Sequence, residues 1–113
     1  MSESVNLLQI TKDARGVVTL TLNDPARFNA LGSEMLAALQ EALNGLAGDD
    51  TVRVVVLAGA GKAFCAGHNL KDMAAHPELA WYQQLFSQCS RMMLSLQQLP
   101  VPVIARVHGM ATA

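Results

Sequence analysis

The chain has few cysteines, few aromatic residues and no excess of charge of either sign. Its 113 residues include two cysteines, and its formal net charge at pH 7 is −1. Because Cys65 and Cys89 lie far apart without metal-ligand spacing, we expect two reduced, largely buried thiols and no metal site. A nearly neutral chain also gives no electrostatic basis for binding nucleic acid or an anionic membrane surface.

Long apolar runs are absent as well. No run in the sequence is long enough to span a bilayer. The segment Met1-Ser2-Glu3-Ser4 resembles neither the apolar region of a secretory signal nor an arginine-rich transit peptide. We therefore expect a cytoplasmic protein that does not interact with membranes.

What is present indicates one small domain with a large buried core. Hydrophobic residues make up 51% of the chain and charged residues 15%. Near the start, apolar and polar residues alternate around Leu8–Ile10 and again around Val18–Leu22, and a turn sequence at Asp13–Gly16 lies between them. This pattern predicts a β-hairpin.

Helices and further strands are predicted in alternation after the hairpin. Ser33 is the expected N-cap of a helix whose leucines at helical spacing end at Gly48. The apolar run Val52–Ala58 is typical of a strand buried on both faces. A short helix over Leu70–Ala74, a long amphipathic helix over Glu78–Leu99 and a strand over Val103–Val107 follow, as listed in chain order. The order predicts an α/β fold with parallel strand pairs and right-handed crossovers.

The loop from Gly59 to Leu70 carries the chemically informative residues. It follows the buried strand, and a loop at the carboxyl end of such a strand is the usual ligand position in open α/β folds. A phosphate-binding P-loop would need glycine at Val56 and serine or threonine at Ala63, and a dinucleotide fingerprint would need glycine at Phe64. The loop therefore matches neither the P-loop motif nor the dinucleotide-binding motif.

Three ordered motifs carry a resemblance to a known family. Ala63–Leu70 reads A-F-C-A-G-H-N-L and is similar to the A-F-x-A-G-x-D-L segment of the crotonase (enoyl-CoA hydratase/isomerase) superfamily. Pro25–Leu31, P-A-R-F-N-A-L, and Pro100–Ala113, P-V-P-V-I-A-R-V-H-G-M-A-T-A, agree in order and distance. Within the superfamily, the G-H-N-L sequence at Gly67–Leu70 and the V-H-G-M-A-T-A sequence at Val107–Ala113 look most like the enoyl-CoA hydratase domain-containing branch.

The resemblance implies a fold and an assembly. It implies a crotonase-like ββα spiral of the ClpP/crotonase type, of which residues 1–113 would be the N-terminal part only, interrupted after the strand Val103–Val107. Members of the superfamily commonly form trimers or hexamers, so a homotrimer or hexamer is expected of the full-length protein. They act in fatty acid metabolism on acyl-CoA thioesters, with coenzyme A as part of the substrate and no separate cofactor.

The resemblance also implies particular site residues. Such proteins stabilise an enolate-like anion with two backbone N–H donors, and the first of these falls on His68. The second donor and any catalytic carboxylates would lie beyond Ala113. The substrate groove would be lined by Arg27, Phe28, Ala30, Ala66, Gly67, His68, Asn69, Leu70 and Lys71. Asn69 departs from the family pattern, which usually has aspartate there.

Several residues keep alternative interpretations. His68 has three possible roles. Its backbone N–H could be the oxyanion donor whatever its side chain, its imidazole could line the pocket without a chemical role, or its imidazole could be an acid–base group. Phe28 could instead be a hydrophobic staple on the following helix. Cys65 could be a nucleophile rather than a buried thiol, and Trp81 and Tyr82 could cover an acyl chain rather than pack.

Three functions follow, from different classes. The first is an enoyl-CoA hydratase or isomerase, a lyase-type enzyme with a backbone oxyanion hole. The second is a homologue that binds acyl-CoA without turnover. The third is a short interaction module. Catalytic carboxylates following the motif at Pro100–Ala113 would distinguish the first from the second.

Overall fold

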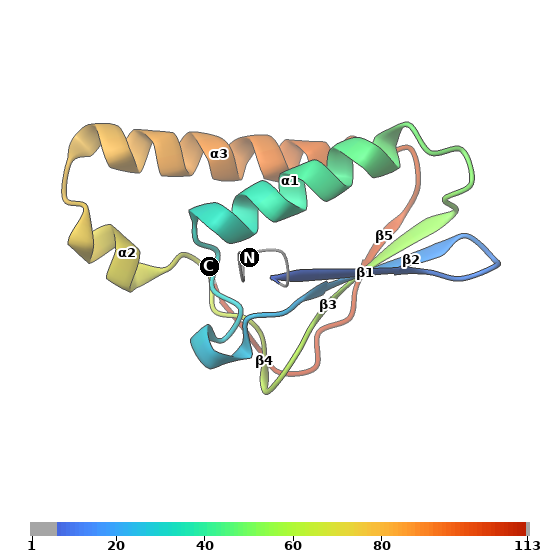
Figure 1. The fold of residues 1–113 in the computed structure, drawn as a ribbon, viewed down its shortest axis with the longest axis horizontal. Helices are drawn as coiled ribbons and strands as arrows, with labels where there is room; N and C mark the ends of the chain where they lie inside the picture. Colours follow the sequence, from blue (N-terminus) through green and yellow to red (C-terminus); the bar gives the residue numbers. More distant parts are fainter. Residues whose placement is uncertain (1–6, 113) are drawn as a thin grey trace, which may run out of the picture.

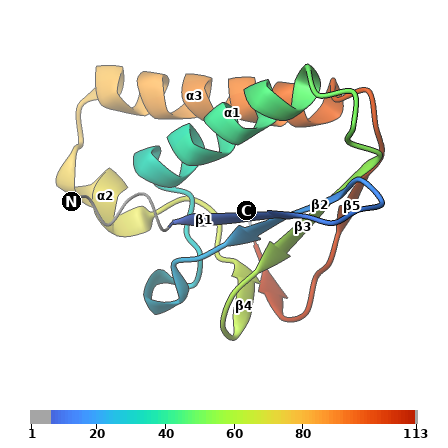
Figure 2. The ribbon, with the colours of Figure 1, turned by 45° about the vertical axis from the view of Figure 1, so that its right-hand side comes forward.

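The computed structural model describes residues 7–112 and has two layers. A four-stranded sheet with the strand order β1-β2-β3-β5 forms one layer. Helices α1 (Ser33–Ala47) and α3 (Leu79–Gln97) lie side by side over one face of this sheet (Figures 1 and 2). The mixed α/β architecture predicted from the sequence is confirmed.

The predicted hairpin is formed by β1 (Leu8–Lys12) and β2 (Val17–Leu22). The two strands are antiparallel, with Leu8 opposite Leu22. Asp13 shapes the turn, because its carboxylate accepts hydrogen bonds from the backbone N–H groups of Arg15 and Val17 at 2.8 and 3.1 Å. Gly16 completes the turn with a φ of +87°, a conformation that favours glycine.

The parallel pairing is also confirmed. Strand β3 (Val54–Gly59) is parallel to β2, and β5 (Val103–Ala105) is parallel to β3. The prediction that the strand is buried on both faces was wrong. Val55 faces the helices and is fully buried, whereas Val54 and Val56 on the opposite face are partly exposed. The described helices cover only one face of the sheet, which explains the difference (Figure 1).

Helix α1 buries Met35, Leu36, Leu39 and Leu43, as its apolar spacing predicts. Its N-cap is Gly32, not Ser33, and the cap makes no side-chain hydrogen bond. Ser33 is already helical, and its carbonyl oxygen accepts a hydrogen bond of 3.0 Å from the amide of Gln88 on α3. The exposed N-terminus of α1 is therefore tied to the neighbouring helix instead of being capped by a serine.

Helices α2 (Leu70–Ala75) and α3 lie close to their predicted positions. The break between them at residues 76–78 is also as predicted. On α3, Leu85 and Met92 are buried, but Phe86 and Met93 stay largely exposed, so the apolar stripe is wider than the core it covers. Among residues 7–112, we find no helix with the length and apolar character needed to cross a membrane.

Three short elements are absent from the sequence prediction. They are a 3₁₀ turn, Pro25–Arg27, and two short strands, β4 (Ala63–Cys65) and β6 (Met110–Ala111). The strands pair in parallel as a second, two-stranded sheet beneath the first (Figure 2). Since β4 lies inside the loop that carries the chemical motif, this small sheet fixes the position of that loop.

Replacing glycine with alanine should change the free energy of unfolding in opposite directions at Gly45 and Gly59. A Cβ atom on Gly45, inside α1, would meet no atom within 4 Å, so Gly45→Ala should raise the free energy of unfolding by about 0.5–1 kcal/mol. A Cβ atom on Gly59 would lie 2.6 Å from the carbonyl oxygen of Phe64, so Gly59→Ala should lower it. Urea unfolding of both variants checks the pair, and a destabilised Gly45→Ala protein would contradict the prediction.

Candidate functional site

Two loops from distant parts of the chain meet at the site. One precedes α1 and the other connects β3 to α2. The backbone N–H of Leu31 donates to the carbonyl oxygen of Gly67 at 2.6 Å, and the N–H of Ala66 donates to the carbonyl oxygen of Phe28 at 2.9 Å. These two bonds hold the motifs at Pro25–Leu31 and Ala63–Leu70 against each other.

Asn29 holds the two loops together. Its side-chain amide donates to the carbonyl oxygens of Ala60, Ala63 and Phe64 at 2.9, 2.9 and 3.2 Å. Its side-chain oxygen accepts from the N–H of Asp24 at 2.8 Å. The residue is fully buried and adopts a left-handed φ of 56°. The sequence analysis did not assign Asn29 a role, and the available signal was an asparagine among apolar neighbours in a loop.

The second loop presents a free backbone donor at His68. Gly67 turns the chain with a φ of +83°, and its own N–H donates to Cys65 Sγ at 3.4 Å. Asn69 caps α2, because its side-chain oxygen accepts from the N–H of Asp72 at 3.2 Å, as predicted for the capping role. Between them, the N–H of His68 donates no hydrogen bond to any residue in the described part of the chain.

His68 lies between two cavities. On one side is a groove of about 500 Å³, which we call the outer groove. Eight of the nine residues predicted to contact substrate line it: Arg27, Phe28, Ala30, Ala66, His68, Asn69, Leu70 and Lys71. The ninth, Gly67, faces the second cavity. Phe28 is 51% exposed and lines the groove, so it does not act as a buried staple on the helix.

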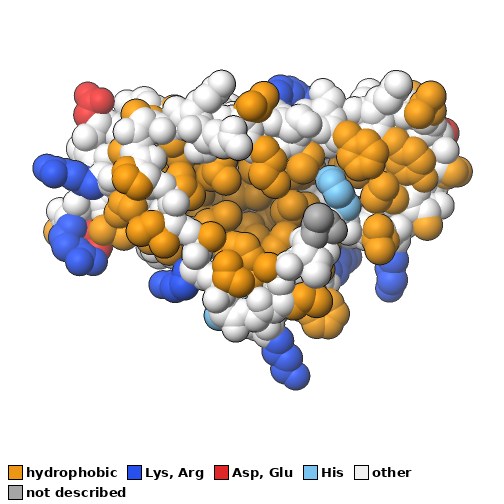
Figure 3. Space-filling view, turned by 180° about the vertical axis from the view of Figure 1, so that it is seen from behind, with side chains coloured by type: hydrophobic (Ala, Val, Ile, Leu, Met, Phe, Trp, Pro, Cys, Tyr) orange, Lys and Arg blue, Asp and Glu red, His pale blue; other side chains and the backbone are white. Residues whose placement is uncertain are grey.

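The second cavity, which we call the apolar hollow, has a volume of about 430 Å³. Its lining is almost wholly hydrophobic and comes from the sheet, α1, α3 and the β4 loop, including Leu22, Leu39, Leu57, Met92 and Leu96. Figure 3 shows this face of the molecule hollowed out and lined by hydrophobic side chains. His68 is the residue that the hollow shares with the outer groove.

Charge is placed at the mouth of the outer groove. Arg27 pairs with Asp24 at 3.6 Å, yet its side chain remains 67% exposed. Lys71 is also exposed on the same groove. Asp72 is the one carboxylate among the described residues that line either cavity at His68. The groove thus offers two cations to an anionic ligand.

The imidazole of His68 is fixed by packing. Its ring meets that of Phe86 edge-on, with centroids 5.3 Å apart. Its Nδ1 atom is buried without a hydrogen-bond partner in the described part of the chain. No described residue orients the ring through Nδ1 in the way that a third group usually orients a general base, which favours the backbone role.

The cysteines are free thiols in a protective environment. Cys65 is buried and Cys89 partly buried. Burial raises the pKa of the Cys65 thiol above its ordinary value, although the hydrogen bond from Gly67 lowers it slightly. Burial, followed by the nearby Cys65, also raises the pKa of Cys89. Both thiols are therefore protonated at neutral pH, which argues against a cysteine nucleophile.

The remaining aromatic and histidine side chains serve packing. His76 stacks on Trp81 with centroids 4.7 Å apart, and the Tyr82 hydroxyl donates to the carbonyl oxygen of Met73 at 2.8 Å. Neither Trp81 nor Tyr82 lines the apolar hollow. His108 binds the carbonyl oxygen of Gly61 through Nε2 at 2.7 Å. No group of three potential metal ligands gathers anywhere in residues 7–112.

The sequence matches a known family along most of its length. Residues 12–113 match the family described as Enoyl-CoA hydratase/isomerase. The enoyl-CoA hydratase domain-containing protein 3, mitochondrial, of Xenopus laevis is 37% identical over 94% of the chain, and the 1,2-epoxyphenylacetyl-CoA isomerase of Escherichia coli is 41% identical over 86%. The chain spans 36% and 38% of the lengths of these relatives.

Solved structures share the fold. The crystal structure of an enoyl-CoA hydratase from Mycobacterium smegmatis superposes with a TM-score of 0.93 at 62% identity, over 95% of this chain and 42% of that one. The human enoyl-CoA hydratase domain-containing protein 3 superposes with a TM-score of 0.87 at 30% identity, over 95% of this chain and 42% of that one. The two-layer arrangement and its second small sheet therefore belong to an established fold.

Proposed function

The chain belongs to the enoyl-CoA hydratase/isomerase family of the crotonase superfamily, and on that premise we propose that it binds an acyl-CoA thioester with the carbonyl oxygen at the backbone N–H of His68. The coenzyme A moiety lies along the outer groove in this proposal. The observation that carries it is that the N–H of His68 has no acceptor in the described part of the chain, while His68 itself lines both the outer groove and the apolar hollow.

A backbone donor in this position suits the chemistry of a thioester enolate. Removing a proton next to the thioester carbonyl, or adding a nucleophile to a conjugated thioester, places negative charge on the carbonyl oxygen. A fixed N–H aimed at that oxygen is worth on the order of 2.7–4 kcal/mol in the transition state. Because the donor is in the backbone, clamped by Gly67 and by the Asn69 cap, its position does not depend on the side chain at position 68.

We assign the reaction to hydration or isomerisation of an enoyl-CoA, both of which pass through such an anion. A role in binding acyl-CoA without turnover is the second candidate. It is favoured by Asn69, where the family pattern has aspartate. Exchange of the acyl α-hydrogens with deuterated solvent distinguishes the two, because it requires an acid–base group.

The predicted assembly and location remain part of this proposal. A homotrimer or hexamer is checked by light scattering of the full-length protein. Coenzyme A enters as part of the substrate, so no further cofactor is proposed. The cytoplasmic location is inferred from the sequence alone, whereas the relatives named above include a protein named as mitochondrial.

Binding of acetoacetyl-CoA tests the groove. We expect Arg27→Ala and Lys71→Ala each to weaken binding about two- to fivefold, because an exposed ion pair contributes about 0–1 kcal/mol. The effect should shrink as salt is raised. Lys62→Ala is the matched control, since Lys62 is an exposed lysine of the same loop that does not line the groove. Equal losses in all three variants by isothermal titration would count against this placement of coenzyme A.

A further inference from the structure

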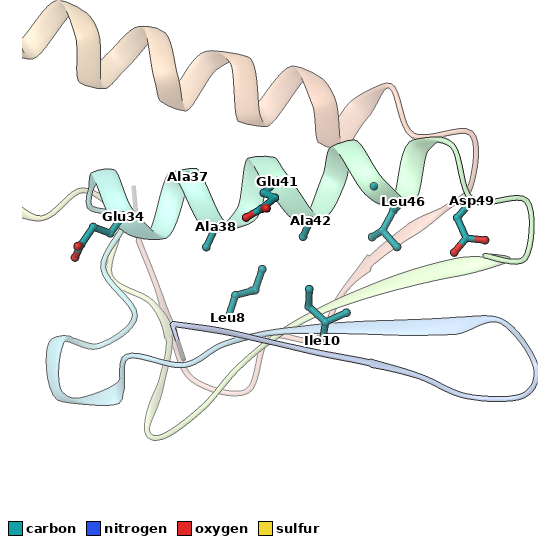
Figure 4. A pocket seen from close by; sticks show the side chains of 10 residues that line it. Leu8, Ile10, Glu34, Ala37, Ala38, Glu41, Ala42, Leu46 and Asp49 are labelled. Atoms are coloured by element: carbon teal, nitrogen blue, oxygen red, sulfur yellow. The ribbon is translucent and has the colours of Figure 1, made fainter. Parts of the chain in front are cut away.

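A second open groove lies on the other side of the molecule, between strand β1 and helix α1. It has a volume of about 770 Å³. Leu8 and Ile10 project from β1 toward the helix, and Ala38 and Ala42 face them from α1 (Figure 4). The space exists because the helix carries alanines here where a packed helix would carry larger side chains. Ile10 remains 54% exposed as a result.

The strand that forms one wall of this groove is at the edge of the sheet. In the described residues β1 pairs only with β2. The carbonyl oxygen of Leu7 accepts from Asn23, and the N–H of Asp13 donates to Val17, so the odd-numbered residues bond toward β2. The antiparallel alternation then points the N–H and C=O groups of the even-numbered residues, centred on Ile10, toward the free edge. Such an edge is a template for another strand.

The rim of the groove is acidic. Glu34, Glu41 and Asp49 line it (Figure 4). Asp49 pairs with Lys12 at 3.6 Å, whereas Glu34 and Glu41 have no ion-pair partner among the described residues. A second copy of the chain would bring the same carboxylates against these, which is unfavourable. Charge complementarity instead favours a partner with basic residues.

We propose that this groove is a docking site for an extended peptide segment that carries apolar residues and flanking basic residues on one and the same face. The segment adds to the edge of β1 through backbone hydrogen bonds. Its apolar side chains enter the groove against Ile10, Ala38 and Ala42, and its basic side chains reach Glu34 and Glu41. This is strand addition, in which backbone bonds supply affinity and alternate side chains supply selectivity.

The test uses a synthetic probe of about eight residues in which every second position faces the helix, with valine at the central facing positions, lysine at the outer facing positions and threonine at the positions between. We expect it to bind the protein at about 50 mM salt and several-fold more weakly at about 300 mM, because salt screens the attraction between its lysines and the two glutamates. Bound peptide should slow hydrogen exchange of the backbone amides of Leu8, Ile10 and Lys12, with no change at Gln9 and Thr11, which already bond to β2.

Two matched comparisons make the test specific. The same peptide with its edge-facing amides N-methylated should not bind, because it cannot make the backbone bonds. The double variant Glu34→Lys, Glu41→Lys should weaken binding at least about tenfold. Glu78→Lys, a charge reversal at an exposed residue outside the groove, should leave binding unchanged.

Three results would overturn the proposal. The first is equal binding of a peptide with glutamate in place of lysine. The second is binding without slowed exchange at the β1 edge. The third is concentration-dependent protection of that edge in the absence of peptide, which would assign the groove to a second copy of the chain. Because the groove does not touch His68, none of these outcomes bears on acyl-CoA binding, and loss of acyl-CoA binding would not bear on this groove.

Discussion

Replacing Asn29 with alanine should lower the free energy of unfolding by about 3 kcal/mol or more. The side chain is fully buried and satisfies three carbonyl oxygens and one backbone N–H. Alanine removes every one of these partners and admits no replacement from the protein. A buried polar group left without a hydrogen bond costs roughly 1–3 kcal/mol. The total is a large part of the 5–15 kcal/mol or so that separates a folded domain from its unfolded state.

The variant Asn29→Asp distinguishes the contribution of the hydrogen bonds of Asn29 to stability from the contribution of its side-chain shape. Asn29→Asp keeps the size of the side chain and the acceptor for Asp24, but it replaces the donating amide with an oxygen that faces three carbonyl oxygens. We expect it to be at least as destabilising as alanine at pH 7. If shape alone mattered, aspartate would instead be nearly neutral.

Urea unfolding checks both variants against Asn44→Ala, which removes an exposed asparagine of α1 and should change stability by less than about 0.5 kcal/mol. The Asn29 variants should also weaken acetoacetyl-CoA binding in whatever fraction remains folded, because Asn29 joins the two loops that form the outer groove. Full stability in Asn29→Ala would contradict our account of how the site is held.

The role of Asn29 illustrates what the sequence could not reveal. Its three acceptors lie 31, 34 and 35 residues further along the chain. No local pattern encodes that distance. The strands β4 and β6 were missed for the same reason, since Ala63 pairs with Met110 and neither strand is long enough to show an alternating pattern.

Elements with strong periodicity were predictable. The hairpin has an alternating pattern and a turn sequence, and α1 buries its apolar positions as spaced. The error at the start of α1 is instructive, because serine is a common N-cap and yet Gly32 occupies that position. Ser33 lies inside the first turn instead, where its carbonyl oxygen accepts from the side-chain amide of Gln88 on α3, a tertiary contact that no local pattern encodes. Propensity is a weak guide wherever such contacts are available.

The residues expected at the candidate site lie together in the structure, while their contact with a substrate stays a prediction. Eight of the nine predicted contact residues line one groove because the family resemblance identified two segments that meet in space. Physical reasoning on the residues alone identified only the loop Gly59–Leu70 and the cap at Asn69. Which backbone N–H is free could be decided only once every hydrogen bond in the loop was known.

That free N–H gives the second large prediction. Deleting it should weaken binding of acetoacetyl-CoA, whose enol resembles the proposed anion, by about tenfold to a hundredfold or more. Replacing the His68 side chain should not. His68→Ala keeps the backbone donor and removes only a ring packed against Phe86, so we expect binding within about threefold of the parent protein and a modest loss of stability.

Two changes delete the donor in different ways. His68→Pro removes the N–H but also restricts Gly67, whose φ of +83° sets the direction of the loop. A backbone ester at position 68, introduced with an α-hydroxy acid by semisynthesis, removes the N–H and leaves the side chain and the loop geometry in place. The ester is therefore the decisive variant, and proline should be at least as severe.

The pattern across the three variants distinguishes the roles of His68. Weak binding in the ester and proline variants with near-normal binding in His68→Ala assigns the role to the backbone. Normal analogue binding in His68→Ala together with lost turnover of an enoyl-CoA would instead assign acid–base chemistry to the imidazole, despite its unpartnered Nδ1. Normal analogue binding in the ester variant would show that the N–H of His68 does not contribute to binding the thioester oxygen. The unused N–H at the junction of groove and hollow would then have to be explained by something other than a thioester oxygen.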